Sequence, residues 1–167
     1  AKDETRPRRT IRAGVGCLAA GDTLYIRAGV YTADRINGAD FVANGTSWTA
    51  PITVSGYPGE TVVLRGGNGA GIVFGNSTNR AYIVVQDLTI DGANWTGPEE
   101  LVYAERNNHH LRFQRLRLLN APEHTCLVGA DDTELLDSYI DGNNRLNLGP
   151  QVGNGWYGYG SRQLVEG

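Results

Sequence analysis

Three stretches of the sequence repeat one pattern: RAYIVVQDLTIDG at 80–92, NHHLRFQRLRLLN at 108–120 and ADDTELLDSYIDG at 130–142. Superposing them requires offsets of 28 residues (83 to 111) and then 22 residues (111 to 133). Self-similarity at such a period, with alternating apolar residues inside each unit, predicts strands stacked as successive coils of a β-solenoid. The predicted columns are Ile83, Leu111 and Thr133; Val85, Phe113 and Leu135; and Ile90, Leu118 and Ile140.

Length, composition and charge limit the classes of protein. A chain of 167 residues fits one domain, and its 23 glycines and six prolines are typical of a turn-rich β protein. The net charge of −3, without a basic stripe, argues against a nucleic-acid partner. No apolar run approaches the roughly 20 residues that a membrane span needs, so we expect no membrane partner. Cys17 and Cys126 are expected to be buried free thiols, with a disulfide as the open alternative.

The N-terminal part predicts a tail followed by a cap. Residues 1–9 are polar and are expected to be flexible, whereas 10–20 predicts a short amphipathic helix with Thr10 as its N-cap. Gly14 and Gly16 weaken this helix by roughly 1 kcal/mol each relative to alanine, so packing must hold it. The helix would cover the first coil, and the coils would occupy 23–167.

The columns extend over about five coils. We expect two strands in each turn, with a third short strand near 62–65 in one of them. The chain reaches 161–167 without a predicted cap, so we also expect a homo-oligomer that forms through this end. The extended columns are Leu24, Ile52 and Ile83; Ile26, Val54 and Val85; and, in the other half of each coil, Phe41, Ile72, Leu101, Cys126 and Trp156.

Two segments carry a family resemblance. The sequence TIRAGVGCLAAGDTLYIRAGVY at 10–31 and APITVSGYPGE at 50–60 resemble the opening of the right-handed parallel β-helix, pectate-lyase-like superfamily. The resemblance implies a single-stranded, all-β, right-handed parallel β-helix. It also implies an extracellular protein that acts on polysaccharides, as a lyase, a hydrolase, an epimerase or a non-catalytic member. The chain departs from the family pattern because no leading strand precedes the capping helix and because it has few coils.

An outward column of charged residues is the first candidate site. Equivalent residues in adjacent coils lie about 4.8 Å apart, so Asp87, Arg115 and Asp137 are expected to stack. Arg117 and Tyr139 lie two residues further along and could bind substrate. The resemblance implies that an arginine acts as base and that acidic residues, here Asp87 and Asp137, hold Ca²⁺. Arginine is a poor base, however, and a surface ion-pair ladder is the alternative interpretation.

Two further groups could carry function. His110 lies beside Asp132 by the 22-residue offset, and this pair could serve in acid–base catalysis or could simply form a turn. Trp48 and Trp95 lie in loops and could form platforms for sugar rings, or could fold back over a coil edge.

The sequence therefore predicts an extracellular polysaccharide-active protein, with a lyase acting on uronate-containing glycans as the leading hypothesis. A glycoside hydrolase belongs to the same class of hypothesis. The alternative is a non-catalytic module that binds carbohydrate or serves a structural role and self-associates through its open end.

Overall fold

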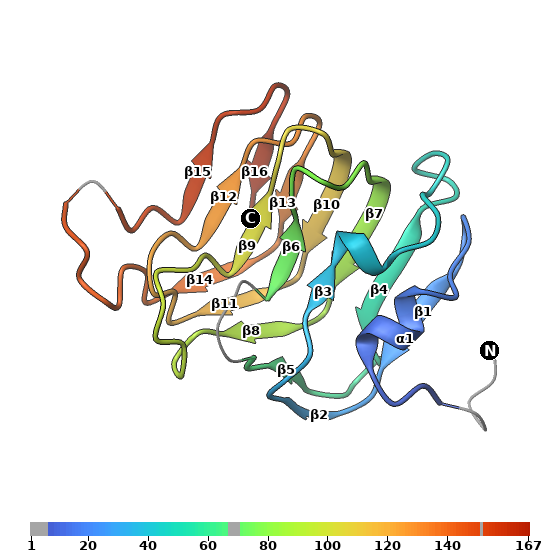
Figure 1. Ribbon diagram of the computed structural model, residues 1–167, viewed down its shortest axis with the longest axis horizontal. Coiled ribbons are helices and arrows are strands. Elements are labelled where there is room, and N and C mark those ends of the chain that lie inside the picture. The colour runs from blue at the N-terminus through green and yellow to red at the C-terminus, as the bar shows by residue number, and fades with distance from the viewer. Residues whose placement is uncertain (1–6, 67–70, 151) are drawn as a thin grey trace.

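Each turn of the chain contributes one strand to each of three parallel sheets, which together form a β-solenoid of about five turns (Figure 1). The computed structural model describes residues 7–66, 71–150 and 152–167. Sheet A contains β1 (Thr23–Ile26), β4 (Ile52–Gly56), β7 (Ala81–Gln86), β10 (His109–Gln114), β13 (Glu134–Leu136) and β16 (Leu164–Glu166). Sheet B contains β2 (Gly29–Tyr31), β5 (Val62–Leu64), β8 (Thr89–Asp91), β11 (Arg117–Leu119) and β14 (Tyr139–Asp141). Sheet C contains β3 (Ile36–Asn37), β6 (Ile72–Phe74), β9 (Val102–Ala104), β12 (Cys126–Val128) and β15 (Trp156–Gly158).

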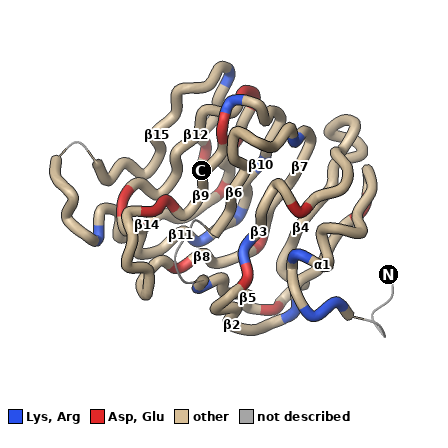
Figure 2. The backbone as a smooth tube through the Cα atoms, viewed as in Figure 1, with Lys and Arg blue, Asp and Glu red and all other residues tan. Residues whose placement is uncertain are grey.

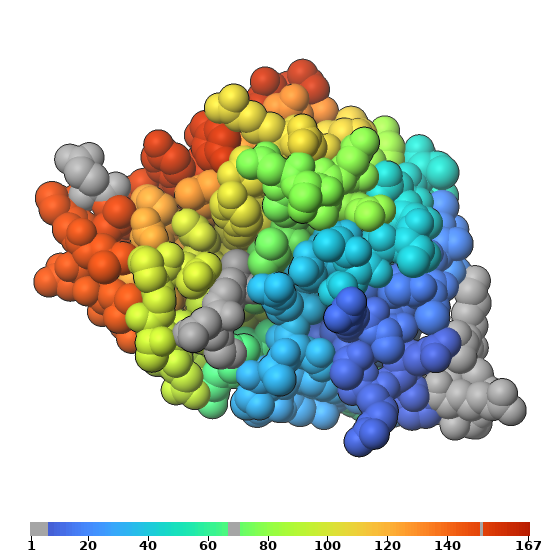
Figure 3. All heavy atoms as spheres, viewed as in Figure 1, coloured from blue at the N-terminus to red at the C-terminus, as the bar shows by residue number. Residues whose placement is uncertain are grey.

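The register of the central turns confirms the repeat. Ile83 pairs with both Ile52 and Leu111, and Leu118 pairs with both Ile90 and Ile140. The inward residues of these columns form one continuous core along the solenoid axis, and burying each large aliphatic side chain contributes roughly 1.5–3 kcal/mol. Figure 3 shows the successive turns as coloured bands that stack from the N-terminal end to the C-terminal end.

Expectations about register are wrong in the first turn and in sheet C. Leu24 pairs with Val54 rather than with Ile52, and Ile26 pairs with Gly56 rather than with Val54. In sheet C, Ile36 takes the place predicted for Phe41, which instead follows a 3₁₀ helix, η1 (Gly38–Asp40), and packs inward. Val102 takes the place predicted for Leu101, because the backbone N–H groups of both residues donate to one carbonyl and shift the strand by one residue. The short sheet B strand occurs in every turn, so a turn has three strands and not two.

The N-terminal helix, α1 (Ile11–Val15), is shorter than the predicted 10–20. Its N-cap is confirmed, since Thr10 Oγ1 accepts a hydrogen bond from Ala13 N at 3.1 Å. A Cβ atom on Gly14 would lie 2.8 Å from the side chain of Leu24, so this glycine lets the helix pack closely on β1. Gly14 therefore has a packing role that offsets its low helix propensity.

The remaining global features concern the tail, the cysteines and charge. Of the tail predicted over 1–9, residues 1–6 lie outside the described part of the chain. Both cysteines are free, but Cys17 is exposed, so the expectation of a buried thiol holds only for Cys126, whose burial raises its pKa.

Basic and acidic residues are interspersed over the coils (Figure 2). In the described ranges, no helix has the length and apolar character needed to cross a membrane.

Candidate functional site

A column of left-handed residues lies near the start of β7, β10, β13 and β16, the last four strands of sheet A along the chain. Tyr82, His110, Asp132 and Arg162 have φ values of 54°, 53°, 51° and 53°. His110 N donates to the carbonyl of Asp131 at 3.0 Å, and Asp132 N donates to the carbonyl of Ser161 at 2.9 Å, so the corners stack directly. Non-glycine residues adopt this conformation at a cost of about 1–2 kcal/mol, which the stacking of equivalent corners must offset.

Aromatic rings gather at this corner. Trp48, from the loop between β3 and β4, lies with its ring centroid 5.4 Å from that of Tyr82 and 6.0 Å from that of His110. The rings of Tyr82 and His110 are 4.5 Å apart. The guanidinium carbon of Arg112 lies 4.2 Å from the centroid of Trp48, a cation–π contact. We call Trp48, Tyr82, His109, His110, Arg112 and Asp132 the corner site.

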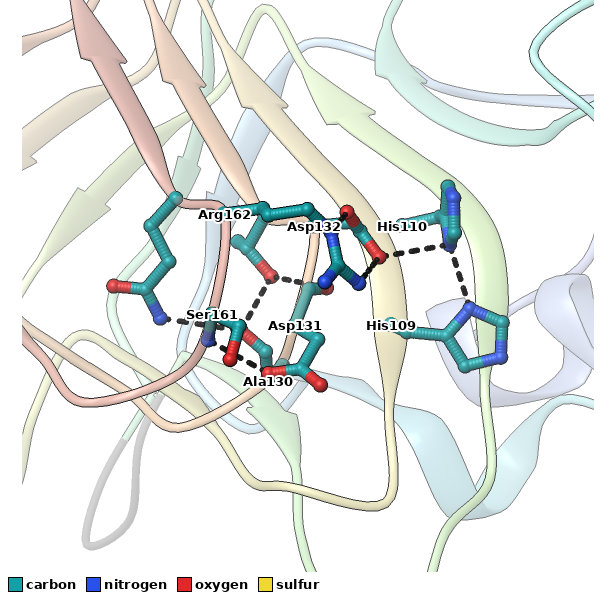
Figure 4. A network of polar contacts seen from close by, with 9 residues as sticks. His109, His110, Ala130, Asp131, Asp132, Ser161 and Arg162 are labelled. Atoms are coloured by element: carbon teal, nitrogen blue, oxygen red, sulfur yellow. Dashed lines mark hydrogen bonds and ion pairs between the residues drawn. The ribbon is translucent and has the colours of Figure 1, made fainter.

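The polar half of the corner site is a chain of hydrogen bonds and one longer ion-pair contact (Figure 4). The Nδ1 atoms of His109 and His110 lie 2.7 Å apart, so one imidazole donates to the other and their tautomers are linked. Asp132 Oδ2 lies 3.8 Å from His110 Nδ1. Arg162 donates two hydrogen bonds to Asp132, at 2.5 and 2.7 Å, and these bonds hold the pKa of that carboxyl below its usual value.

The two imidazoles and the charged groups beside them determine the chemistry that is available at this corner. Because their Nδ1 atoms face each other, the two imidazoles direct their Nε2 atoms away from the shared bond, and a neutral ring with a free Nε2 can accept a proton. Arg112 also forms an ion pair with Glu134 at 2.5 Å. Asp131 has the structural role expected for a turn, since its carboxylate accepts from Ser161 N at 2.7 Å. The corner thus combines a proton-transfer group, a cation and an aromatic surface.

The predicted Asp87–Arg115–Asp137 column forms a second corner, between sheets A and B. Its residues have φ values of 57°, 50° and 47°. Arg115 donates to both oxygens of Asp87, at 2.7 and 3.0 Å. These bonds lower the pKa of Asp87 and raise the pKa of Arg115, so the guanidinium stays protonated and is not available to accept a proton. Arg115 and Asp87 thus form one ion pair of the kind that the alternative interpretation, a surface ladder, expects.

The acidic residues of the second corner do not fit a calcium ion in this arrangement. Both oxygens of Asp87 are bound by Arg115, and one of them also accepts a hydrogen bond from Ser55 at 3.3 Å. Calcium requires six to eight oxygen ligands. Across the described ranges, no group of three or more His, Cys, Asp or Glu side chains is placed to hold a metal ion.

The other predicted binding residues lie apart from the corner site. Arg117 and Tyr139 pair on the outward side of sheet B, with the guanidinium carbon 5.3 Å from the ring centroid, and Tyr139 is 53% exposed. Trp95 is only 1% exposed, so its predicted role as a surface platform for sugars is wrong. It packs inward beside Gly71, where a Cβ atom would lie 2.5 Å from the side chain of Ile90 and 3.6 Å from the indole.

Three functional candidates were missed in the sequence. Tyr82 lies 28 residues before His110, so the repeat offset alone could have placed it in the same column. Arg112 follows His110 by two residues and pairs with Glu134 in the next turn by the 22-residue offset. Arg162 could not be found in this way. The three repeated stretches end at residue 142, so they define no offset between β13 and β16. The position of Trp48 depends on a loop conformation that periodicity does not encode.

The case for the corner site rests on its geometry. Comparisons of the chain with protein-family models, with curated proteins and with solved structures found no match.

Proposed function

We propose that this protein is an extracellular polysaccharide-active protein and that the corner site acts as a lyase on uronate-containing glycans. The observation that carries the proposal is the convergence of Trp48, His110 and Arg112 within one corner. An indole ring offers a flat apolar surface to a sugar ring, and a guanidinium pairs with a carboxylate. The imidazole supplies the base that such a reaction needs. The resemblance to pectate-lyase-like proteins supports the same class of substrate and the extracellular location.

In the proposed reaction, His110 removes the proton from the carbon next to the uronate carboxyl group. A carbon–carbon double bond forms as the bond to the glycosidic oxygen breaks, and the proton then passes to the departing oxygen. Arg112 would bind the uronate carboxylate and withdraw negative charge as it develops. Asp132 and His109 are positioning residues, because both lie against the Nδ1 side of His110. In the proposed reaction Nδ1 of His110 donates to His109, which leaves the Nε2 of His110 unprotonated and able to act as the base.

The test measures unsaturated uronate products by ultraviolet absorbance with pectate and alginate, each with and without Ca²⁺. We expect His110→Gln to lower kcat by about 10²–10⁴-fold, the usual contribution of a general base. Trp48→Ala should mainly raise KM. Loss of activity in Arg115→Ala with full activity in His110→Gln would move the site to the second corner. Product formation that requires Ca²⁺ would restore the predicted calcium role, and no product from either glycan would rule out the lyase.

Binding without turnover is the second candidate function. The observation that favours it is that the arginines of both corners are already paired: Arg112 with Glu134, Arg162 with Asp132 and Arg115 with Asp87. A paired guanidinium is less able to neutralise a substrate carboxylate, but it can still stack and donate hydrogen bonds. Calorimetric binding of a glycan that depends on Trp48, without any product, would favour this function.

A further inference from the structure

The outward side of sheet C carries a straight row of apolar side chains that the corner site does not use. Alternate residues of a strand face opposite sides, and the first and last residues of β6, β9 and β12 are fully buried, so the middle residues point outward. The register stacks these middle residues over four consecutive turns. The row consists of Val73, Tyr103, Leu127 and Tyr157. We call this row, together with Tyr159, the sheet C face.

The ring of Tyr157 lies flat against the protein. One side of it stacks on the imidazole of His124, with a centroid distance of 5.1 Å and an angle of 19° between the rings. His124 is only 6% exposed, and its Nδ1 atom accepts a hydrogen bond from Asn154 N at 3.1 Å. Tyr157 itself is 47% exposed. A ligand would therefore meet an aromatic surface that is already ordered, which lowers the entropy lost on binding.

Tyr159 is held along the solenoid axis. Its hydroxyl donates to Glu105 at 2.8 Å, and Glu105 follows β9, two turns before the turn of Tyr159. The side chain crosses Gly129 in the intervening turn, where a Cβ atom would collide with the ring. The hydroxyl of Tyr103 donates to the other oxygen of Glu105 at 2.5 Å. One carboxylate thus fixes two rings of the sheet C face.

The polar atoms of the face suit an uncharged ligand that is rich in hydroxyl groups. Because the phenol protons of Tyr103 and Tyr159 are directed at Glu105, the phenol oxygens keep lone pairs that can accept hydrogen bonds from a ligand. The guanidinium carbon of Arg106 lies 5.2 Å from the ring centroid of Tyr159 and brings a positive charge to the same side as the charge of Glu105. Since Arg106 covers part of the Tyr159 ring, Tyr157 is the main stacking surface. Sugars combine an apolar C–H face for such a ring with a rim of hydroxyl donors.

The spacing of the rings favours one kind of sugar chain. The Cα atoms of Tyr103 and Tyr157 lie two turns apart, a distance of about 9.6 Å. In a β-1,4-linked chain of glucose, every second sugar presents the same face, and one such disaccharide has a similar length. We propose that the sheet C face binds a neutral β-1,4-linked glycan that runs along the solenoid axis. The proposal does not rest on the function proposed for the corner site, because the two surfaces lie on different sheets.

The experiment titrates the full chain with cellohexaose by isothermal calorimetry and compares it with maltohexaose, whose α-1,4 linkages make the same glucose units coil. We expect cellohexaose to bind at least about fivefold more tightly than maltohexaose. Tyr157→Ala should weaken binding of cellohexaose by about fivefold or more, whereas Tyr157→Phe keeps the ring and should keep the affinity. Tyr139→Ala is the matched control, because it removes a similarly exposed tyrosine from sheet B and should leave the affinity unchanged.

Several outcomes would overturn the proposal. Equal affinity for the two hexasaccharides, or no binding of cellohexaose, would show that the face does not recognise a β-1,4-linked chain. Equal loss of binding in Tyr139→Ala would show a nonspecific effect of surface aromatics. Tighter binding of hexagalacturonate that also depends on Tyr157 would assign the face to an acidic glycan. Trp48→Ala separates the two proposals: it should weaken uronate turnover at the corner site and leave binding of cellohexaose intact.

Discussion

Asn108 is a buried side chain whose amide oxygen and amide nitrogen both make several hydrogen bonds. It has no exposed surface, and it joins the end of β6 to the segment before β7 and to its own turn. The Nδ2 group donates to three carbonyl oxygens and Oδ1 accepts two hydrogen bonds; the partners are Phe74, Gly75, Glu105, Thr78 and Arg80. An asparagine in this place acts as a peptide group, since it satisfies backbone atoms that the loop leaves unpaired.

Replacing this side chain should therefore be costly. We expect Asn108→Ala to lower the free energy of unfolding by about 3–4 kcal/mol, because it leaves several buried polar groups unsatisfied. The measurement is urea denaturation followed by circular dichroism. Asn107→Ala is the control, because Asn107 is exposed and donates to the carbonyl of Asn76, and it should cost less than about 1 kcal/mol. Equal losses for the two variants would contradict the assigned role.

Asp91 gives the fold a dependence on pH. Its carboxylate is 8% exposed and accepts hydrogen bonds from Arg65, Asn120 and the backbone of Ala93. Burial raises its pKa, but the bonds from Asn120, Ala93 and Arg65 outweigh burial, and the net pKa is lowered. A lowered pKa means that the ionised group stabilises the folded state above the pKa of the unfolded chain. This contribution is lost as the pH falls through the lower pKa of the folded state.

We therefore expect Asp91→Asn to lower the free energy of unfolding at pH 7 by roughly 1.5–3 kcal/mol, the range for a hydrogen-bonded buried charge. The difference from the unmodified chain should shrink below about pH 4, where the unfolded chain takes up the proton. Thermal unfolding at several pH values measures this difference in stability between Asp91→Asn and the unmodified chain. A difference that stays constant from pH 7 to pH 3 would show that the charge of Asp91 contributes nothing.

At the scale of elements, close backbone contacts between turns decide which residues are allowed. A Cβ atom on Gly56, at the end of β4, would lie 2.2 Å from the carbonyl oxygen of Asp87 in the next turn. That oxygen belongs to the backbone of a left-handed corner and cannot move without disturbing the stack. We expect Gly56→Ala to destabilise the fold by about 2–4 kcal/mol.

Gly75 is the matched control for this substitution. It follows β6 at the end of the strand, and a Cβ atom there would meet nothing within 4 Å. Gly75→Ala should change the free energy of unfolding by less than about 1 kcal/mol, and a reduced entropy of the unfolded chain could make it stabilising. Chemical denaturation of both variants checks the prediction. Similar losses at the two positions would mean that backbone freedom, and not the contact with Asp87, determines the effect.

The strands and the helix also show how much of the secondary structure could be predicted from the sequence. The columns of sheets A and B in the central turns were predictable, because Ile83, Leu111 and their neighbours alternate with outward residues at a detectable offset. The division of each repeat unit into two strands was not predicted, so the number of strands per turn was wrong. Sheet C was predicted less well, since its strands are short and a bulge before Val102 shifts the register by one residue. The helix was predicted too long because apolar spacing continues to Leu18, which is buried without being helical.

The candidate site was predictable only in part, for the same physical reason. The offset of 22 residues brought His110 beside Asp132, and their atoms lie 3.8 Å apart. Nothing in the periodicity placed Trp48 over the same corner, because the repeat period does not determine the conformation of a loop between two strands. The burial of Trp95 shows the reverse case, since an indole in an equally polar loop turned inward instead.

At the scale of the whole molecule, each turn contacts mainly its two neighbours, so stability should vary along the axis. The strands β7 and β10 are paired on both sides, and their inward residues are fully buried. β16 is paired only with β13, and Leu164 and Val165 remain 46% and 54% exposed. β1 also has one partner strand, but α1 packs against it.

Hydrogen exchange should follow this gradient. We expect the amides of β7 and β10 to exchange most slowly and those of β16 to exchange fastest, because local opening costs less where a strand has one partner and few buried contacts. Mass spectrometry of peptides from each strand measures these exchange rates. Uniform protection from β1 to β16 at low concentration would show that the turns open together, and the solenoid would then behave as one cooperative unit rather than as a stack.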